Sequence, residues 1–237
     1  MKPISPTEPV TDLRRIKIIE NGEPLVNFLE IYPSLMLDRP RFDYERETFL
    51  RKSVAEKLFA ANESLLSKGM HLRIIEGWRP PFIQRRMYEW SWARFTALHP
   101  EWSETRLRRT TNRFTAPMTE KVPPPHTTGG AMDLALYKGD TALQMVDPYE
   151  QRDHKGFVAN APLLGDEAKR HREIMAEALL PTGITNYPSE YWHWSYGDQG
   201  WAYRGGHDHA IYAAITPPNW QPHESHTRKE PLNYVFE

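Results

Sequence analysis

The sequence predicts an α+β fold, with helices packed around a small central antiparallel or mixed sheet. Three observations support this prediction. Helical and strand-like apolar patterns alternate along the chain, the predicted strands are short, and 21 prolines among 237 residues punctuate it with turns and long loops. No internal repeat is visible, which argues against a solenoid, and we expect a single domain over residues 1–237.

The first strong element is a helix over residues 48–68. Its apolar residues recur at helical spacings of three and four: Leu50, Val54, Leu58, Ala61 and Leu65. Gly69 is placed to end the helix, and the apolar stripe should pack on the sheet.

A short strand follows in HLRIIEGWRPP and breaks at Gly77. The chain then runs through Arg79 into a second helix, where Pro81 suits the first turn. Ile83, Met87 and Trp90 share one face of that helix. Arg79 is therefore expected at a strand-to-helix corner.

The stretch 101–125 is basic and then rich in proline, and we expect it to be a loop. It leads into VPPPHTTGGAMDLALYKGD, where larger apolar residues alternate with smaller ones around Asp133. This period of two predicts a strand with the Asp133 carboxylate on its small-residue face.

A third helix is predicted over about residues 166–180, because acidic residues open it and Pro181 and Gly183 follow it. The aromatic segment YPSEYWHWSYGDQGWAY, residues 187–203, then alternates like a strand. After about Pro217 the chain is polar, and we expect a tail wrapped on the surface.

The composition excludes several classes of function. There are 30 basic and 31 acidic residues, so neither a nucleic acid nor an anionic membrane is expected as partner. Cysteine is absent, so nitrogen and oxygen atoms would have to hold any metal ion. No stretch suits a secretory signal or a membrane span, and we expect a cytoplasmic protein. No feature of the sequence indicates an oligomeric state.

His126, Asp133 and His193 form the candidate metal site. Gly129 and Gly130 permit a tight turn between His126 and the strand of Asp133, so an imidazole and a carboxylate can meet at one point. His193 is the natural third ligand if its strand neighbours that of Asp133. Two histidines and one carboxylate make a zinc site with the fourth position open for water, and we expect one zinc per chain.

Catalysis at such a site needs a carboxylate that takes a proton from zinc-bound water and passes it to the leaving amine, and Glu190 suits this role. Residues three apart on an ideal strand face opposite ways, so Glu190 and His193 can both face the metal only if the backbone bends between them. Arg79 could stabilise the oxyanion that develops on the substrate.

The other histidines are expected to be structural. His71, His99, His154 and His171 stand alone in the sequence. The pairs His207/His209 and His223/His226 have spacings compatible with a metal, but no set of partner ligands accompanies them.

The motifs GWRPP, HTTGGAMDL and EYWHW occur in this order and together resemble the zinc D-alanyl-D-alanine dipeptidases of the vancomycin-resistance type, within the D,D-carboxypeptidase group of metallopeptidases. The resemblance covers about residues 72–196 and implies a family-like core at about 46–200, with both terminal extensions packed on it. It also implies zinc ligation by His126, Asp133 and His193, Glu190 as general base and acid, and Arg79 as stabiliser of the tetrahedral intermediate.

The implied function is zinc-dependent hydrolysis of D-Ala-D-Ala or a related small dipeptide by zinc-bound water, with Glu190 as general base. The alternatives are a D,D- or L,D-carboxypeptidase acting on peptidoglycan stem peptides and a non-catalytic zinc-bound binding domain; Glu190 and Arg79 favour an enzyme. The chain departs from the family pattern at Pro124, where the family has a serine that helps to hold the substrate's free amine. We expect Glu150, or as second choice Asp147, to hold that amine.

Overall fold

The structure is a computed structural model that describes residues 8–146, 154–162 and 164–235. The strands are β1 (Lys17–Ile18), β2 (Leu25–Asn27), β3 (Met36–Leu37), β4 (Phe49–Arg51), β5 (Met70–Glu76), β6 (Ala131–Lys138), β7 (Thr141–Ala142), β8 (Thr185–Asn186), β9 (His193–Ser195) and β10 (His209–Ala210). The α-helices are α1 (Val10–Leu13), α2 (Phe28–Ile31), α3 (Lys52–Leu66), α4 (Pro81–Leu98), α5 (Glu104–Phe114), α6 (Asp166–Leu179), α7 (Gln199–Gly205) and α8 (Glu224–Thr227). Three 3₁₀ turns are described: η1 (Pro125–Thr128), η2 (His154–Phe157) and η3 (Leu180–Thr182).

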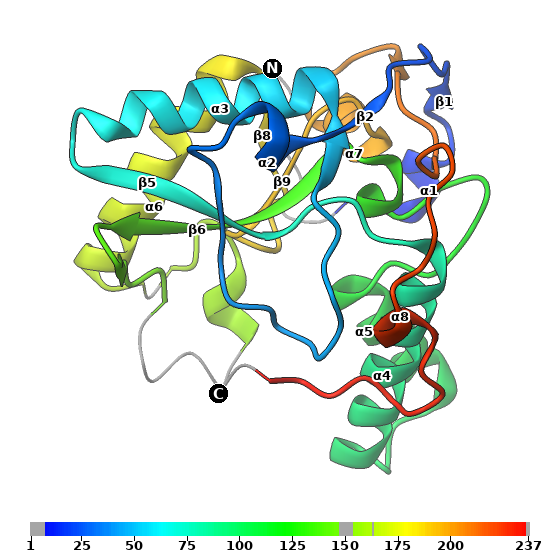
Figure 1. Cartoon of the computed structure of the whole chain (residues 1–237). Helices are drawn as coiled ribbons and strands as arrows, with labels where there is room; N and C mark the ends of the chain where they lie inside the picture. The colour runs from blue at the N-terminus through cyan, green and yellow to red at the C-terminus, as the bar shows by residue number, and fades with distance from the viewer. Residues whose placement is uncertain (1–7, 147–153, 163, 236–237) are drawn as a thin grey trace.

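The central sheet has the strand order β3-β5-β6-β9-β8, with β7 paired to β6 at the side (Figure 1). β3 pairs with β5 in parallel, and the other pairs are antiparallel. The predicted α+β class with a small mixed sheet is therefore confirmed. The two longest strands of the sheet, β5 and β6, lie side by side at its centre.

Helices α3 and α6 pack with the sheet to form the main core. Every apolar position predicted for the first helix is buried there. From the sheet, the larger residues of β6 enter the same core: Met132, Leu134 and Leu136. The predicted helix nevertheless begins too early, because residues 49–51 form β4, which pairs with β2. The third predicted helix corresponds to α6.

The prediction of a loop over residues 101–125 is wrong for its first half, which forms α5. The Ser103 side chain caps this helix by accepting a hydrogen bond from the Arg106 backbone N–H at 3.4 Å. Leu107 and Thr111 are its buried residues, and α5 packs against α4 as a hairpin (Figure 1). The helix has a very polar composition, so its stability depends on this packing more than on an apolar stripe that a sequence pattern would reveal.

The prediction of a strand through the aromatic segment 187–203 is also wrong for most of its length. Only β9 is extended, and α7 begins after Asp198, whose side chain accepts a hydrogen bond from the Trp201 backbone N–H at 2.6 Å. Residues 187–192 form consecutive turns. These turns are held by Asn186, whose side-chain amide donates to the carbonyl oxygens of Glu190, Tyr191 and His193.

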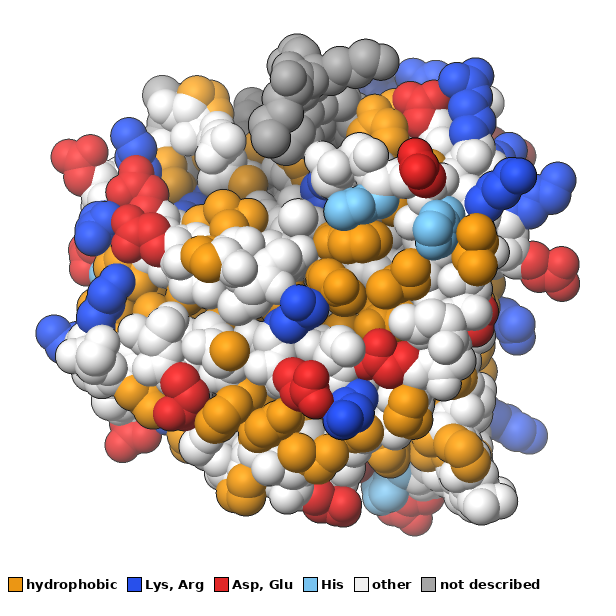
Figure 2. All heavy atoms as spheres, turned by 90° about the horizontal axis from the view of Figure 1, so that it is seen from above, with side chains coloured by type: hydrophobic (Ala, Val, Ile, Leu, Met, Phe, Trp, Pro, Cys, Tyr) orange, Lys and Arg blue, Asp and Glu red, His pale blue; other side chains and the backbone are white. Residues whose placement is uncertain are grey.

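The polar segment after Pro217 packs back on the molecule. Phe42 forms an isolated antiparallel bridge with Tyr234, and His226 is buried with a ring nitrogen on the Glu45 carbonyl. Acidic and basic side chains both scatter over the face in Figure 2, in keeping with the net charge of −1. Within the described part of the chain, no helix combines the length and apolar character needed to cross a bilayer.

Candidate metal centre and catalytic site

Strand register brings Asp133 and His193 together. β6 pairs with β9 so that Asp133 lies directly opposite His193, and on its other side β6 pairs with β5 so that Asp133 lies opposite Glu76. Directly opposed residues on antiparallel strands have Cβ atoms about 4.5–5.5 Å apart, so their side chains can meet. The expected neighbourhood of the two strands is confirmed.

His126 reaches the same point from η1. The turn that follows it places Gly129 at φ 71°, a left-handed conformation that favours glycine. A Cβ at Gly129 would lie 2.3 Å from the Leu25 side chain, and one at Gly130 would lie 2.5 Å from the Tyr196 carbonyl oxygen. Both glycines are therefore needed for the close return from His126 to β6.

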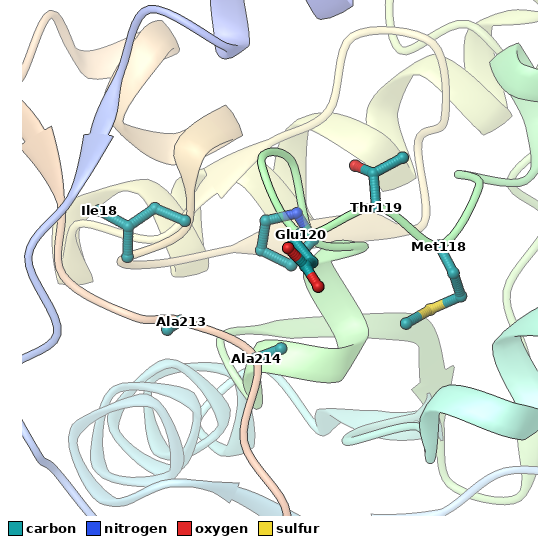
Figure 3. Close-up of a pocket in the computed structure, with 7 residues that line it drawn as sticks. Ile18, Met118, Thr119, Glu120, Ala213 and Ala214 are labelled. Atoms are coloured by element: carbon teal, nitrogen blue, oxygen red, sulfur yellow. The ribbon is translucent and has the colours of Figure 1, made fainter.

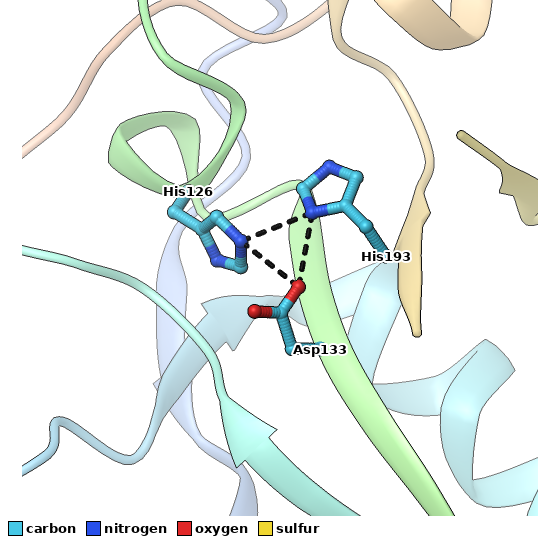
Figure 4. Close-up of side chains that lie close together, drawn as sticks. All are labelled: His126, Asp133 and His193. Carbon is cyan, nitrogen blue, oxygen red and sulfur yellow. Dashed lines mark hydrogen bonds and ion pairs between the residues drawn. The ribbon is translucent and has the colours of Figure 1, made fainter. Parts of the chain in front are cut away.

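The three side chains point at one another from η1, β6 and β9 (Figure 4). His126 Nε2 lies 3.1 Å from His193 Nδ1 and 3.3 Å from Asp133 Oδ1, and His193 Nδ1 lies 3.0 Å from Asp133 Oδ1. Ligands about 2.0–2.1 Å from a tetrahedral zinc ion lie roughly 3.3–3.4 Å apart, so the donor triangle is close to the size that zinc requires. Within the described ranges, this is the one group of three or more potential ligands.

Protonation also favours a cation at this point. The Nδ1–H of His126 can donate to the Gly77 carbonyl oxygen at 2.9 Å, which leaves the Nε2 lone pair facing the other two side chains. Burial, together with the charge of Arg79, lowers the pKa of His126. Burial raises the pKa of Asp133, but His126 and His193 outweigh it and hold that pKa well below its usual range. Burial lowers the pKa of His193, but Asp133 outweighs it and raises that pKa, so a cation bound here has to displace a proton from this ring. The group thus offers a neutral His126 imidazole and a charged carboxylate.

The chain turns between Glu190 and His193, and the Glu190 carboxyl group interacts electrostatically with His193 and Asp133. The His193 backbone N–H donates to the Glu190 carbonyl oxygen at 3.2 Å, so the bend that the sequence required is present. Burial raises the pKa of Glu190 to about 7, an effect that His193 opposes and Asp133 reinforces. A carboxyl group with a pKa near neutrality is suited to accept and return a proton.

We expect Glu190 to lower the free energy of unfolding of the metal-free protein as pH rises from about 4.5 to about 7. In this window the folded state holds a proton on Glu190 that the unfolded state has lost, so this group contributes a decrease of up to about 1.4 kcal/mol per pH unit. Urea unfolding with a chelator present should show the decrease in the wild type relative to Glu190→Gln. Parallel pH profiles for the two proteins would contradict the raised pKa.

Arg79 lies beside the three donors in a buried polar cluster. Its Nη1 donates to Gln84 Oε1 at 2.6 Å, and its Nη2 lies 3.7 Å from Glu76 Oε2, which accepts a hydrogen bond from the Tyr44 hydroxyl at 2.5 Å. Arg79 Nε is buried without a hydrogen-bond partner in the described part of the chain. The cluster therefore fixes the guanidinium and leaves one N–H available.

Sequence reasoning missed the partners of this arginine and a second arginine near the site. Gln84 follows GWRPP by one helical turn and Glu76 precedes it, so their closeness in sequence was a usable signal. Arg41, whose Nη1 lies 3.6 Å from Asp133 Oδ2, carried no such signal because it is remote from every motif.

Other candidate residues lie elsewhere or outside the described ranges. Glu150 and Asp147 fall among residues that the structure does not describe. Pro124 is buried just before η1, and its carbonyl accepts from the Thr127 backbone N–H. His207 stacks on Trp201 with ring centroids 3.8 Å apart, away from the three donors.

A surface hollow of about 410 Å³ borders the segment before η1 (Figure 3). Its lining is Ile18, Met118, Thr119, Glu120, Pro123, Ala213 and Ala214. None of the three donors lines it, so this hollow is separate from the candidate metal centre.

Comparison with known proteins gives a consistent result. A family model described as D-ala-D-ala dipeptidase matches residues 36–212. A D-alanyl-D-alanine dipeptidase of Synechocystis sp. is 25% identical in an alignment of 246 positions that spans 87% of this chain and 95% of the relative.

Three solved structures of peptidases are similar at low sequence identity. The vancomycin-resistance D,D-pentapeptidase VanY in complex with Zn(II) is 12% identical with a TM-score of 0.42, and the match covers 82% of this chain and 95% of that one. VanYB in complex with D-alanine-D-alanine is 13% identical with a TM-score of 0.43, and the match covers 83% of this chain and 93% of that one. The LD-carboxypeptidase LdcB is 16% identical with a TM-score of 0.41, and the match covers 84% of each chain.

Proposed function

Because the chain belongs to the D-Ala-D-Ala dipeptidase family of metallopeptidases, we propose that it hydrolyses D-Ala-D-Ala or a related dipeptide in a zinc-dependent reaction with Glu190 as general base. The observation that carries the proposal is the convergence of two imidazoles and one carboxylate beside a carboxyl group whose pKa is about 7. A pure binding domain has no need of that carboxyl group.

His126 Nε2, Asp133 Oδ1 and His193 Nδ1 are the proposed zinc ligands. The size of their triangle and the absence of cysteine support zinc on nitrogen and oxygen ligands. Zinc held there would supply a Lewis acid that polarises the substrate carbonyl and lowers the pKa of bound water toward about 7. The Gly77 carbonyl holds the His126 ring in the tautomer that this ligation needs.

Glu190 is the proposed proton carrier. Its carboxylate takes a proton from the attacking water and gives it to the nitrogen of the scissile peptide bond, which then leaves as an amine. A pKa near 7 supports both halves of this cycle, because the group is readily deprotonated for the first transfer and readily protonated for the second.

Arg79 is the proposed stabiliser of the negative charge that develops on the carbonyl oxygen. Among the described residues the buried Nε–H has no partner, and this supports the role, since such a donor costs stability unless the reacting substrate supplies an acceptor. Gln84 and Glu76 hold the guanidinium in place before the substrate arrives.

Arg79→Lys is expected to lower kcat by about 100-fold while zinc content stays unchanged. The planar guanidinium fork of Arg79 can bind Gln84 and at the same time present a second N–H to an oxyanion. The ammonium group of lysine has no such fork. Steady-state kinetics should be run beside Arg85→Lys, an exposed position on the same helix. A wild-type rate for Arg79→Lys would mean that the residue acts only as a positive charge.

The substrate's length and stereochemistry are open to a direct experiment. Zinc analysis should be combined with an amine-release assay on D,D- and L,L-dipeptides and on longer peptides ending in D-Ala-D-Ala. Preferred release from the D,D-dipeptide is the expected result. Preference for the longer peptides would favour the carboxypeptidase alternative, in which the missing serine at Pro124 matters little because no free amine needs to be held.

A further inference from the structure

Arg41 brings a second guanidinium to the candidate active site. Its Nη1 lies 3.6 Å from Asp133 Oδ2, the carboxylate oxygen on the opposite side from the donor triangle. The guanidinium carbon lies 4.6 Å from the centroid of the Trp192 ring, so the cation packs against an aromatic face. Trp192 directly precedes the proposed ligand His193, which places Arg41 at the rim of the site.

Within the described ranges, the Arg41 guanidinium makes no hydrogen bond. Its contacts there are the ion pair with Asp133 and the packing on Trp192, and its side chain is 24% exposed. Arg79 differs, because its side chain is 8% exposed and is bonded to Gln84 beside Glu76. Of these two cations, Arg41 is the more exposed to an incoming carboxylate.

The backbone of Arg41 is fixed by residues 231–235, here called the C-terminal strap. The Val235 N–H donates to the Arg41 carbonyl oxygen at 2.9 Å. Two residues further on, the Asp43 carboxylate accepts two hydrogen bonds from Asn233. The backbone N–H of Asn233 donates to Oδ1 at 2.8 Å, and its side-chain amide donates to Oδ2 at 3.0 Å. An arginine on a loop held in this way loses less conformational entropy when it binds a ligand.

Arg41 is also close enough to the donor group to matter for a short substrate. Consecutive Cα atoms are 3.80 Å apart, so in a dipeptide the C-terminal carboxylate lies within one residue of the scissile carbonyl. A carboxylate held there needs a cation near the donor group, and Arg41 Nη1 lies 3.6 Å from Asp133 Oδ2.

We propose that Arg41 binds the C-terminal carboxylate of the substrate and so restricts cleavage to the last peptide bond. This inference rests on the proposed hydrolysis of a peptide at the His126, Asp133 and His193 centre. Arginine is suited to the role because its planar fork can bind a carboxylate through two N–H groups. A cation bound to Asp133 would neutralise the carboxylate that now faces Arg41. The carboxylate of the substrate would then become the main counter-charge of Arg41.

The test compares D-Ala-D-Ala with its C-terminal amide on the zinc-loaded wild type, Arg41→Met and Arg39→Met. Arg39 is a matched control because it is exposed on the same loop. The wild type and Arg39→Met should favour the free acid. Arg41→Met should lose about 10- to 150-fold in kcat/KM on the free acid, mainly through KM, with little change on the amide.

A second measurement separates recognition from turnover. Dissociation constants for the acid and the amide are measured by calorimetry on zinc-loaded Glu190→Gln, with and without Arg41→Met. Loss of affinity for the acid alone is expected. If the wild type cleaves neither compound, the proposed function fails, whereas this binding experiment still decides the role of Arg41.

Two results would overturn the inference. An equal loss on acid and amide would mean that Arg41 supports the structure of the site or the reaction itself. An unchanged preference for the acid in Arg41→Met would mean that another group binds the carboxylate.

Discussion

Glu190→Gln is expected to lower kcat by about 10²–10⁴-fold while the protein keeps its fold and its zinc. Glutamine has nearly the same shape as glutamate, so the turns over residues 187–192 should survive, since Asn186 holds them through backbone carbonyl oxygens. The lost property is proton transfer, because an amide cannot take a proton from water at neutral pH. Steady-state kinetics and metal analysis of the purified variant test this expectation.

The matched control for this experiment is Glu89→Gln, an exposed glutamate on α4. It changes the net charge by the same amount and should keep the wild-type rate. Near-normal turnover of Glu190→Gln would rule out Glu190 as the general base. Loss of zinc together with activity would instead give Glu190 a role in holding the metal.

Removal of any one proposed ligand should abolish both zinc binding and hydrolysis. His126→Ala, Asp133→Ala and His193→Ala each leave two donors of the three, and two ligands rarely retain zinc against a chelator. Zinc content after dialysis should fall from one per chain to near zero, and activity to background. Metal analysis and the amine-release assay check the two effects separately.

The comparison requires evidence that each variant is folded. Circular dichroism supplies it, and His207→Ala serves as the control because that imidazole stacks on Trp201 outside the donor group. A variant that keeps full zinc would remove its residue from the proposed site. Full activity without zinc would overturn the proposed mechanism.

Much of the fold was predictable because local patterns record burial. The helical spacing from Leu50 to Leu65 predicted α3, and the alternation around Asp133 predicted β6. The start of α3 was misplaced because β4 exists only through its pairing with β2, which no pattern within residues 48–51 encodes. For the same reason α5 was missed, since its hairpin contact with α4 stabilises it.

The candidate site was predictable where its residues lie in short motifs. HTTGGAMDL contains both the glycine turn and two donors, and EYWHW contains Glu190 and His193 with the bend between them. The motifs did not indicate that the Asn186 side chain stabilises that bend by donating to three carbonyl oxygens. A contact between a side chain and the backbone of a turn produces no periodic pattern in the sequence.

The sequence by itself determined which groups are available to this protein: a cysteine-free donor set, Glu190 as the proposed proton carrier and an arginine at a strand-to-helix corner. Only the tertiary structure decided which further groups join them. The register of β5, β6 and β9 places Glu76 and His193 on either side of Asp133. The C-terminal strap binds the backbone of Arg41, whose side chain lies near Asp133 Oδ2. Such contacts join segments distant in the chain and depend on packing of the whole molecule, whereas sequence patterns report only the faces of single helices and strands.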